Sequence, residues 1–419
     1  MRVFHDRPYV IADAILNTMG SMQHTFGVRE LIRAGLQDLD KARELLQELQ
    51  DNGVSDDRLQ SLMATLEHSC DPDVALRNLI DIIKALQSQG RRFDDIVTSG
   101  EGLTRLVTVL GVSDEMGKLM RFRPELVAAA ANDACESHLY NHAQRRAHVL
   151  EAVGADPQES AMPKAGLPLP EAATALRQTY RKQLAAIMAQ DAMETDPTTI
   201  QPRISQELSD LADAALEGAL AIARNEIEGS EHVRFTIIGM GKLGAQELNY
   251  VSDVDLIYVV EPADPDTNGM TLNRIGTKLA TTLQRVCQSV IMGVAEPTLW
   301  QIDGGLRPEG KDGPLVRRLE SHEAYYEQWA ENWEFQALLK ARPVAGDPEL
   351  GKAYMDMTRP FVWTASKRDN FVYDCQQMRK RVEDLIPAPL KDREIKLGRG
   401  GLRDVEFTVQ MLQLVHGLS

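Results

Sequence analysis

The chain has 419 residues, of which 43% are hydrophobic and 26% are charged, and its formal net charge at pH 7 is −16. This length exceeds what one hydrophobic core usually organises, so two or three domains are expected. The acidic balance argues against a nucleic-acid-binding protein, because such proteins hold the phosphate backbone with clustered Lys and Arg.

The cysteines and the hydropathy pattern indicate a cytoplasmic protein without a membrane segment. Cys70, Cys135, Cys287 and Cys375 lie far apart in the sequence and form no zinc or redox motif. Scattered thiols of this kind suit a reducing compartment. Charged and polar residues interrupt every apolar stretch of residues 1–20, and no run of about 18 apolar residues occurs elsewhere, so neither a secretory signal nor a membrane helix is predicted.

Residues 1 to about 230 are predicted to be helical. Asp51-Asn52-Gly53 is expected to end a first helix, whose apolar face is formed by Leu31, Ile32, Leu36, Leu39, Leu45, Leu46 and Leu49. Asp71-Pro72 predicts the start of another helix, with the aspartate as N-cap and the proline in the first turn. A short helix is expected around 103–110 and a long one around 208–222. Between them, the Pro-, Gly- and Ala-rich stretch 154–170 is predicted to be a linker.

The pattern then changes to short segments rich in β-branched and aromatic residues. "RFTIIGM" (234–240), "DLIYVVE" (255–261) and "TLWQIDG" (298–304) predict three strands, with a helix at 272–287 between the second and the third. From 320 onward the chain is predicted to be helical again. The expected class is α+β, with a helical N-terminal region at 1–160, an αβ core with lead-in helices at 171–345, and a helical C-terminal region at 346–419.

The stretch from 237 to 261 supports two interpretations. Gly239, Gly241 and Gly244 spell G-x-G-x-x-G after the first predicted strand, and Glu261 ends the second, which outlines a dinucleotide-binding βαβ unit for NAD. That unit needs a helix of about three turns between the strands. Residues 244–252, "GAQELNYVS", are too short and too poor in helix formers to supply it, so this interpretation is disfavoured.

The second interpretation is a metal site beside a phosphate-binding turn. Asp253 and Asp255 are two residues apart at a strand start, so both side chains are expected on one face. Carboxylates this close repel each other unless a cation neutralises them, and Mg²⁺ is usually held by carboxylates and substrate phosphates. The turn "GMGKLG" offers backbone N–H groups for a phosphate, and Lys242 adds a positive charge. This combination is the pattern of nucleotidyltransferases.

A third carboxylate and an arginine complete the predicted site. Asp303 ends the third predicted strand, and Arg307 follows with a planar fork suited to phosphate. Each residue also has a plainer interpretation: D-x-D as a polar strand cap, Arg307 as a turn arginine and Lys242 as a solvated lysine. The aromatic residues at helical spacing are expected in the core rather than around a ligand, and these are Tyr325, Tyr326, Trp329 and Trp333. His322 and His416 are expected to be structural or solvent-exposed.

Four segments, in this order, resemble the glutamine synthetase adenylyltransferase/adenylyl-removing family. They are "GMGKLGAQELNYVSDVDLIYV", "DGGLRPEGKDGPLV", "WEFQALLKARPVAGD" and "KLGRGGLRDVEFTVQMLQLVHG", and the similarity runs from about 235 to 419. The resemblance implies a polymerase-β-like nucleotidyltransferase core. The last segment is a family hallmark for which the sequence alone offers no physical role.

The resemblance also implies a site and its ligands. Asp253, Asp255 and Asp303 match the metal-binding carboxylates, for two Mg²⁺ ions with Mn²⁺ as an alternative. Gly241-Lys242 matches the phosphate turn, and the predicted nucleotide and phosphate contacts are Gly239, Gly241, Lys242, Ser252 and Arg307. The implied partners are glutamine synthetase, ADP or ATP, phosphate and a PII-type nitrogen signal protein.

Family members carry two such domains in a longer chain. The start at Met1, the helical lead-in and the single D-x-D motif are expected of the first half, which is associated with phosphorolytic removal of AMP from a tyrosine of glutamine synthetase, in the control of nitrogen metabolism. Three alternatives stay open: addition of AMP from ATP, a nucleotide-binding module without catalysis, and the NAD-dependent enzyme.

Overall fold

The computed structural model describes residues 26–133, 140–265 and 267–417. These residues form two compact units, unit 1 with 26–133 and 188–195, and unit 2 with 140–187, 196–265 and 267–417. The predicted division at 1–160, 171–345 and 346–419 stays a prediction. Cys135 lies outside the described residues. Among the described helices, none combines the length and the apolarity that crossing a bilayer requires.

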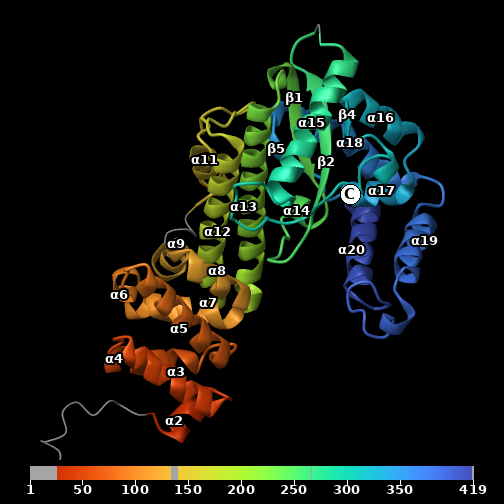
Figure 1. Cartoon of the computed structure of the whole chain (residues 1–419). Helices are drawn as coiled ribbons and strands as arrows, with labels where there is room; N and C mark the ends of the chain where they lie inside the picture. Colours follow the sequence, from red (N-terminus) through yellow and green to blue (C-terminus); the bar gives the residue numbers. More distant parts are fainter. Residues whose placement is uncertain (1–25, 134–139, 266, 418–419) are drawn as a thin grey trace, which may run out of the picture. The chain divides into compact units, whose positions relative to one another are not determined.

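Unit 1 is built from helices (Figure 1). They are α2 (Val28–Arg33), α3 (Leu39–Asp51), α4 (Asp56–Leu66), α5 (Pro72–Ser88), α6 (Phe93–Ile96), α7 (Gly100–Val112), α8 (Asp114–Phe122), α9 (Pro124–Ala128) and the π-helix η1 (Ala129–Asp133). The predicted N-cap of α5 is confirmed, because the Asp71 carboxylate accepts a hydrogen bond from the Val74 N–H at 3.0 Å.

The single helix predicted across Leu31–Leu49 is wrong. The chain forms two helices here, and Gly35 between them has a φ of +81°, a left-handed conformation typical of the residue after a helix end. Ile32, which was expected on the buried face, is 59% exposed. The apolar residues keep a helical spacing on both sides of Gly35, but the left-handed conformation of this glycine ends the first helix.

Unit 2 contains a small mixed sheet between two sets of helices (Figure 1). Its strands are β1 (Val233–Gly239), β2 (Val254–Pro262), β3 (Ile302–Asp303), β4 (Val316–Arg317) and β5 (Arg342–Gly346). The order is β3-β2-β1-β5, and β4 also pairs with β2. β1 is antiparallel to β2 and β5, whereas β3 and β4 are parallel to β2. The predicted α+β class is confirmed.

The helices of unit 2 precede, interrupt and follow the strands. They are α11 (His142–Ala152), α12 (Leu169–Met193, whose last residues belong to unit 1), α13 (Pro197–Glu226), α14 (Gly241–Gly244), α15 (Gly269–Gln288), α16 (Leu319–Gln328), α17 (Asn332–Leu338), α18 (Pro348–Thr364), α19 (Phe371–Asp384) and α20 (Leu402–His416), with short 3₁₀ turns η2 (Ser230–His232), η3 (Gly310–Asp312), η4 (Ala365–Lys367) and η5 (Ala388–Leu390).

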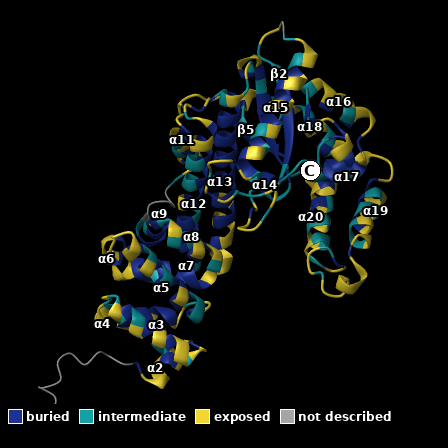
Figure 2. Ribbon diagram, in the orientation of Figure 1, coloured by how far each residue is buried: buried dark blue, intermediate teal, exposed yellow. Residues whose placement is uncertain are grey.

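Successive side chains of β1 and β2 point to opposite faces of the sheet, and both faces are buried. Phe235 and Ile237 belong to one core, which α12, α13 and α15 share. Ile238, Ile257 and Val259 belong to a second core, with aromatic residues of α16, α17 and α18. Figure 2 shows α13 buried along most of its length, as expected for a helix at the centre of the first core. Asp255 alternates in step with Ile257 and therefore lies on the face of the second core.

The NAD-binding βαβ interpretation is excluded by this topology. A βαβ unit requires parallel strands joined by a crossover helix. Here β1 and β2 are antiparallel, and the connecting helix α14 has four residues. The crossover helix lies instead between β2 and β3, where α15 was predicted.

The predicted linker and the predicted third strand both differ in detail from expectation. Residues 154–168 contain no helix but lie within unit 2, where the Arg224 guanidinium of α13 donates to the carbonyls of Ala161 and Pro163. The third strand is shorter than predicted, because residues 298–301 form no ladder. Arg181 of α12 holds that segment instead, donating to the carbonyls of Pro297 and Thr298 at 2.8 and 2.7 Å.

Candidate active site

The turn between β1 and β2 lies directly against Asp255. The Met240 N–H donates to the Asp255 carbonyl at 2.8 Å, and Gly241 follows with a φ of +54°. A Cβ added at Gly241 would lie 2.5 Å from Asp255 Oδ2. Only glycine therefore allows the turn to approach this carboxylate so closely.

Asp255 and Asp303 are neighbours across the parallel strands β2 and β3. They are direct partners in the strand register, and both are half-buried. The Asp303 carboxylate is fixed by the Gly305 N–H, which donates to Oδ1 at 2.7 Å. Asp253 lies two residues before Asp255 and is exposed. The carboxylate oxygens of these three described residues do not all lie within 4.8 Å of one another, which is the spacing expected of ligands to one metal ion.

The electrostatics of Asp255 are those of a carboxylate beside other carboxylates. Burial, together with the negative charges of Asp253 and Asp303, raises its pKa to about 6, and the positive charges of Arg403 and Lys396 oppose this rise. The cluster is therefore short of positive charge, which is the condition that favours a divalent cation.

Asp255 and Asp303 open into a cavity of about 280 Å³. Its walls come from α17, α19 and α20, and the lining residues beyond the carboxylates are Gly241, Gly305, Leu306, Trp333, Gln336, Ala337, Lys340, Met378, Val382, Arg403, Glu406, Phe407 and Gln410. Trp333 was predicted in the core but is half-buried in this wall, and Trp329 is 74% exposed, so the core prediction holds only for Tyr326 and the half-buried Tyr325.

The hallmark segment 396–407 supplies positive charge near Asp255. Arg379 of α19 donates to the carbonyls of Leu397 and Gly398 at 3.0 and 2.9 Å and forms an ion pair with Asp404. These contacts fix the loop before α20 and present Lys396 and Arg403 toward Asp255. Sequence reasoning missed both residues, although the positive charges within a Gly-rich family motif were the available signal.

A second, larger hollow of about 770 Å³ adjoins the first and shares Lys340, Arg403, Glu406 and Gln410 with it. Lys242 and Lys396 also line it. Lys340 forms ion pairs with Glu247 and Glu406 at 2.8 and 2.7 Å, and Arg403 forms one with Glu406 at 2.9 Å. Lys242 and Lys396 form no ion pair with another described residue, so they are the cations best placed to meet an anionic group.

Arg307 differs from its predicted phosphate role. Its guanidinium donates to the carbonyls of Gly304, Lys311 and Gly313 at distances of 2.8–3.2 Å, which uses all three nitrogens. This is the alternative of a turn arginine, and it holds the loop that follows Asp303.

The remaining predicted residues lie around the turn. Lys242 donates to Asn249 Oδ1 at 3.4 Å, and Ser252 is half-buried just before β2. Gly239 serves packing, since a Cβ there would lie 2.7 Å from Val344 Cγ1 of β5. His322 is buried beside Tyr354, and burial lowers its pKa to about 3, which confirms its structural interpretation.

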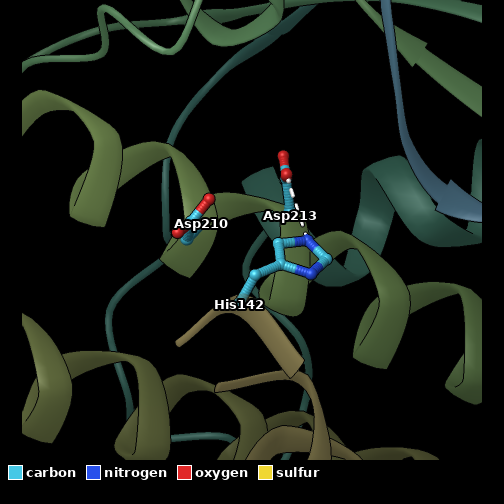
Figure 3. Close-up of side chains that lie close together, drawn as sticks. All are labelled: His142, Asp210 and Asp213. Carbon is cyan, nitrogen blue, oxygen red and sulfur yellow. Dashed lines mark ion pairs between the residues drawn. The ribbon is translucent and has the colours of Figure 1, made fainter. Parts of the chain in front are cut away.

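His142, Asp210 and Asp213 form a separate group with the donor spacing of metal ligands (Figure 3). His142 Nε2 lies 3.4 Å from Asp213 Oδ2, and the Asp213 carboxylate also receives Arg342 at 2.6 Å. Asp210 accepts from the Gln246 amide at 3.2 Å. Because Asp213 is already neutralised by Arg342, this group has less need of a cation than the cluster at Asp255.

The sequence profile of the glutamate-ammonia ligase adenylyltransferase family matches residues 103–357, which includes the sheet and the turn before Asp255. The chain belongs to this family. The profile of a second family, GlnD PII-uridylyltransferase, matches residues 376–419, where α19 and α20 cover the cavity.

Several curated proteins are similar to this chain. A bifunctional glutamine synthetase adenylyltransferase/adenylyl-removing enzyme of Bifidobacterium longum is 76% identical over 93% of this chain, which is 36% of that protein. Proteins with the same description from Cutibacterium acnes and Streptomyces avermitilis are 43% and 41% identical, over 93% and 95% of this chain and 39% and 37% of theirs. The chain thus spans little more than a third of these curated relatives.

Proposed function

We propose that this chain removes AMP from an adenylylated tyrosine of glutamine synthetase, with phosphate as the attacking group and ADP as the product. The observation that carries the proposal is the pairing of Asp255 with Asp303 in register, beside a glycine turn and inside one cavity. Family membership supports nucleotidyl transfer as the reaction class. The names of the relatives support glutamine synthetase as the protein substrate.

The carboxylates fit a magnesium site, because a raised Asp255 pKa reports negative charge that a divalent cation would neutralise. Asp255 and Asp303 would be the principal ligands, and the exposed Asp253 carboxylate would be the third. Bound Mg²⁺, with Mn²⁺ as the alternative, would supply charge stabilisation to the attacking and leaving oxygens.

The residues of the chain would bind and orient the reacting groups. The backbone N–H groups of residues 241–243 and the side chains of Lys242, Lys396 and Arg403 would hold the phosphates, since the N–H groups of Met240 and Gly244 already donate to carbonyls of the chain. A phosphate oxygen attacks the phosphorus of AMP-tyrosine, the bond to the tyrosine oxygen breaks, and that oxygen leaves and takes up a proton. Inorganic phosphate is already largely ionised near neutral pH, so the site needs no strong general base.

The direction of transfer is the finer part of the proposal. Adenylylation by ATP uses the same carboxylates and is the alternative, because a site that stabilises the transition state accelerates both directions. A silent nucleotide-binding module is disfavoured by the intact carboxylates. A PII-type partner has weaker support, because the match to the uridylyltransferase profile covers the helices that line the cavity rather than a separate surface.

Two parallel assays test the proposal. One supplies adenylylated glutamine synthetase, phosphate and Mg²⁺, and we expect ADP and unmodified synthetase. The other supplies unmodified synthetase and labelled ATP, and we expect little incorporation. Rapid labelling without ADP release would assign the opposite direction, and silence in both assays would favour the binding module.

A further inference from the structure

Gln336 is a buried amide that lines the candidate cavity and has one unsatisfied end. The side chain is on α17, is 2% exposed and lines the cavity that contains Asp255 and Asp303. Its Nε2 donates to Gln410 Oε1 of α20 at 2.8 Å, whereas its Oε1 has no hydrogen-bond partner among the described residues. A buried carbonyl oxygen without a partner is destabilising, so a ligand donor is the expected complement.

The wall around Gln336 is suited to a flat ring. Trp333 and Phe407 are half-buried aromatic side chains of α17 and α20, and Met378 and Val382 add apolar contacts from α19. Half-buried aromatic surfaces of this kind bind bases by stacking. The volume of about 280 Å³ is near the lower end of small-molecule pockets, about 300–1,000 Å³, and suits one nucleoside.

We propose that Gln336, held in place by Gln410, selects adenine in this cavity by accepting a hydrogen bond from the 6-amino group of the base. The position of Gln336 within the carboxylate-lined cavity places the base and the reacting phosphorus in one site. Adenine offers an N–H donor at its 6-position, whereas guanine has a carbonyl acceptor there. Two acceptors facing each other repel, so the same amide oxygen that binds adenine rejects guanine.

Gln410 is the positioning residue of the pair. It is 7% exposed, and by accepting from Gln336 Nε2 it leaves the Oε1 end free. If both amides were turned by half a rotation, Gln336 would present an N–H group instead and would favour a 6-carbonyl base. The preference between adenine and guanine therefore reports the orientation of both side chains.

The inference rests on the proposed function, because it assigns the base of the same nucleotide. The test measures the binding of three nucleotides to the chain by titration calorimetry in the presence of Mg²⁺. The ligands are ADP, GDP and the diphosphate of purine riboside, which lacks the 6-amino group. For the parent chain we expect ADP to bind about tenfold more tightly than either analogue, the equivalent of one hydrogen bond.

Gln336→Leu should abolish this preference. ADP should lose about tenfold in affinity, whereas the purine analogue should change little, and Gln376→Leu at an exposed position of α19 is the matched control. The comparison of ligands on the parent chain needs no variant, so misfolding of Gln336→Leu cannot obscure the result.

The outcomes separate the two proposals. Tight ADP binding with no loss against the purine analogue would overturn the role of Gln336 and leave nucleotidyl transfer standing. Tighter binding of GDP than of ADP would overturn the assignment of adenine as the base that Gln336 selects. Absence of binding for all three diphosphates would overturn both the proposed function and this inference.

Discussion

Arg342 of β5 joins Asp213 of α13 to the turn beside the candidate site. Its two terminal nitrogens donate to the Asp213 carboxylate at 2.6 and 3.1 Å, and its Nη2 and Nε also donate to the carbonyls of Leu243 and Gly244 at 3.0 and 3.2 Å. Asp213 is 1% exposed, so its charge depends on this partner. The contact ties the end of α14 to the central helix of the first core.

Asp213→Asn is expected to destabilise the chain strongly. Breaking a buried ion pair costs about 3–5 kcal/mol, and we expect about 3 kcal/mol because the Arg342 side chain is 24% exposed. Urea unfolding of the parent and the variant measures the loss. The control is Asp356→Asn, which removes the exposed pair with Lys352 and should change stability far less. Equal losses in both variants would contradict the structural role of Asp213.

Asp255→Asn and Asp303→Asn are expected to remove nucleotidyl transfer while leaving the fold intact. Each change deletes a carboxylate of the proposed metal pair but also relieves repulsion between neighbours, so the metal-free protein should unfold at the same temperature or higher. ADP release and thermal unfolding report the two effects separately. Glu151→Gln, at an exposed position of α11, is the control. Activity within tenfold of the parent at saturating Mg²⁺ would rule out the metal assignment.

Arg307→Ala and Arg403→Ala should fail in different ways. Arg307 holds the loop after Asp303 through four hydrogen bonds to carbonyls, so its loss should lower stability by about 1–3 kcal/mol. Arg403 lines both hollows and faces Asp255, so its loss should raise the KM for phosphate with little change in stability. Steady-state kinetics at varied phosphate, paired with urea unfolding, separates the two. A phosphate defect confined to Arg307→Ala would restore that residue to the binding site.

The core of unit 2 could be predicted because its signals are local. The β-branched runs of β1 and β2, the crossover helix α15 and the same-face spacing of Asp253 and Asp255 depend on residues close together in the chain. The pairing of Asp303 with Asp255 followed from the topology that those signals allow. The length of the strand before Asp303 was overestimated, because Arg181 of α12, rather than a neighbouring strand, binds the backbone carbonyls at its start.

The rest of the site depends on contacts that sequence spacing does not encode. Arg403 lines the same cavity as Asp255, and Arg379 and Asp404 fix the loop that precedes it. Gln336 and Gln410 meet from helices far apart in the chain, and nothing in either segment marks an unsatisfied amide. Arg307 carried the right chemistry for phosphate, but the carbonyls of its own loop are nearer.

The stability of unit 2 should depend on pH through His142. The hydrogen bond to Asp213 raises the pKa of His142, with support from Asp210, whereas burial and the charge of Arg342 oppose the rise. A histidine whose pKa is raised by folding stabilises the folded state below about pH 6.5, and this contribution is lost as the pH rises through the raised value. The parent should therefore exceed His142→Gln in free energy of unfolding at pH 6, by under about 1 kcal/mol because the side chain is 48% exposed. The gap should shrink at pH 8.5. Urea unfolding of both proteins at the two pH values measures it, and a gap that widens toward pH 8.5 would show that the imidazole does not interact with Asp213 as an imidazolium.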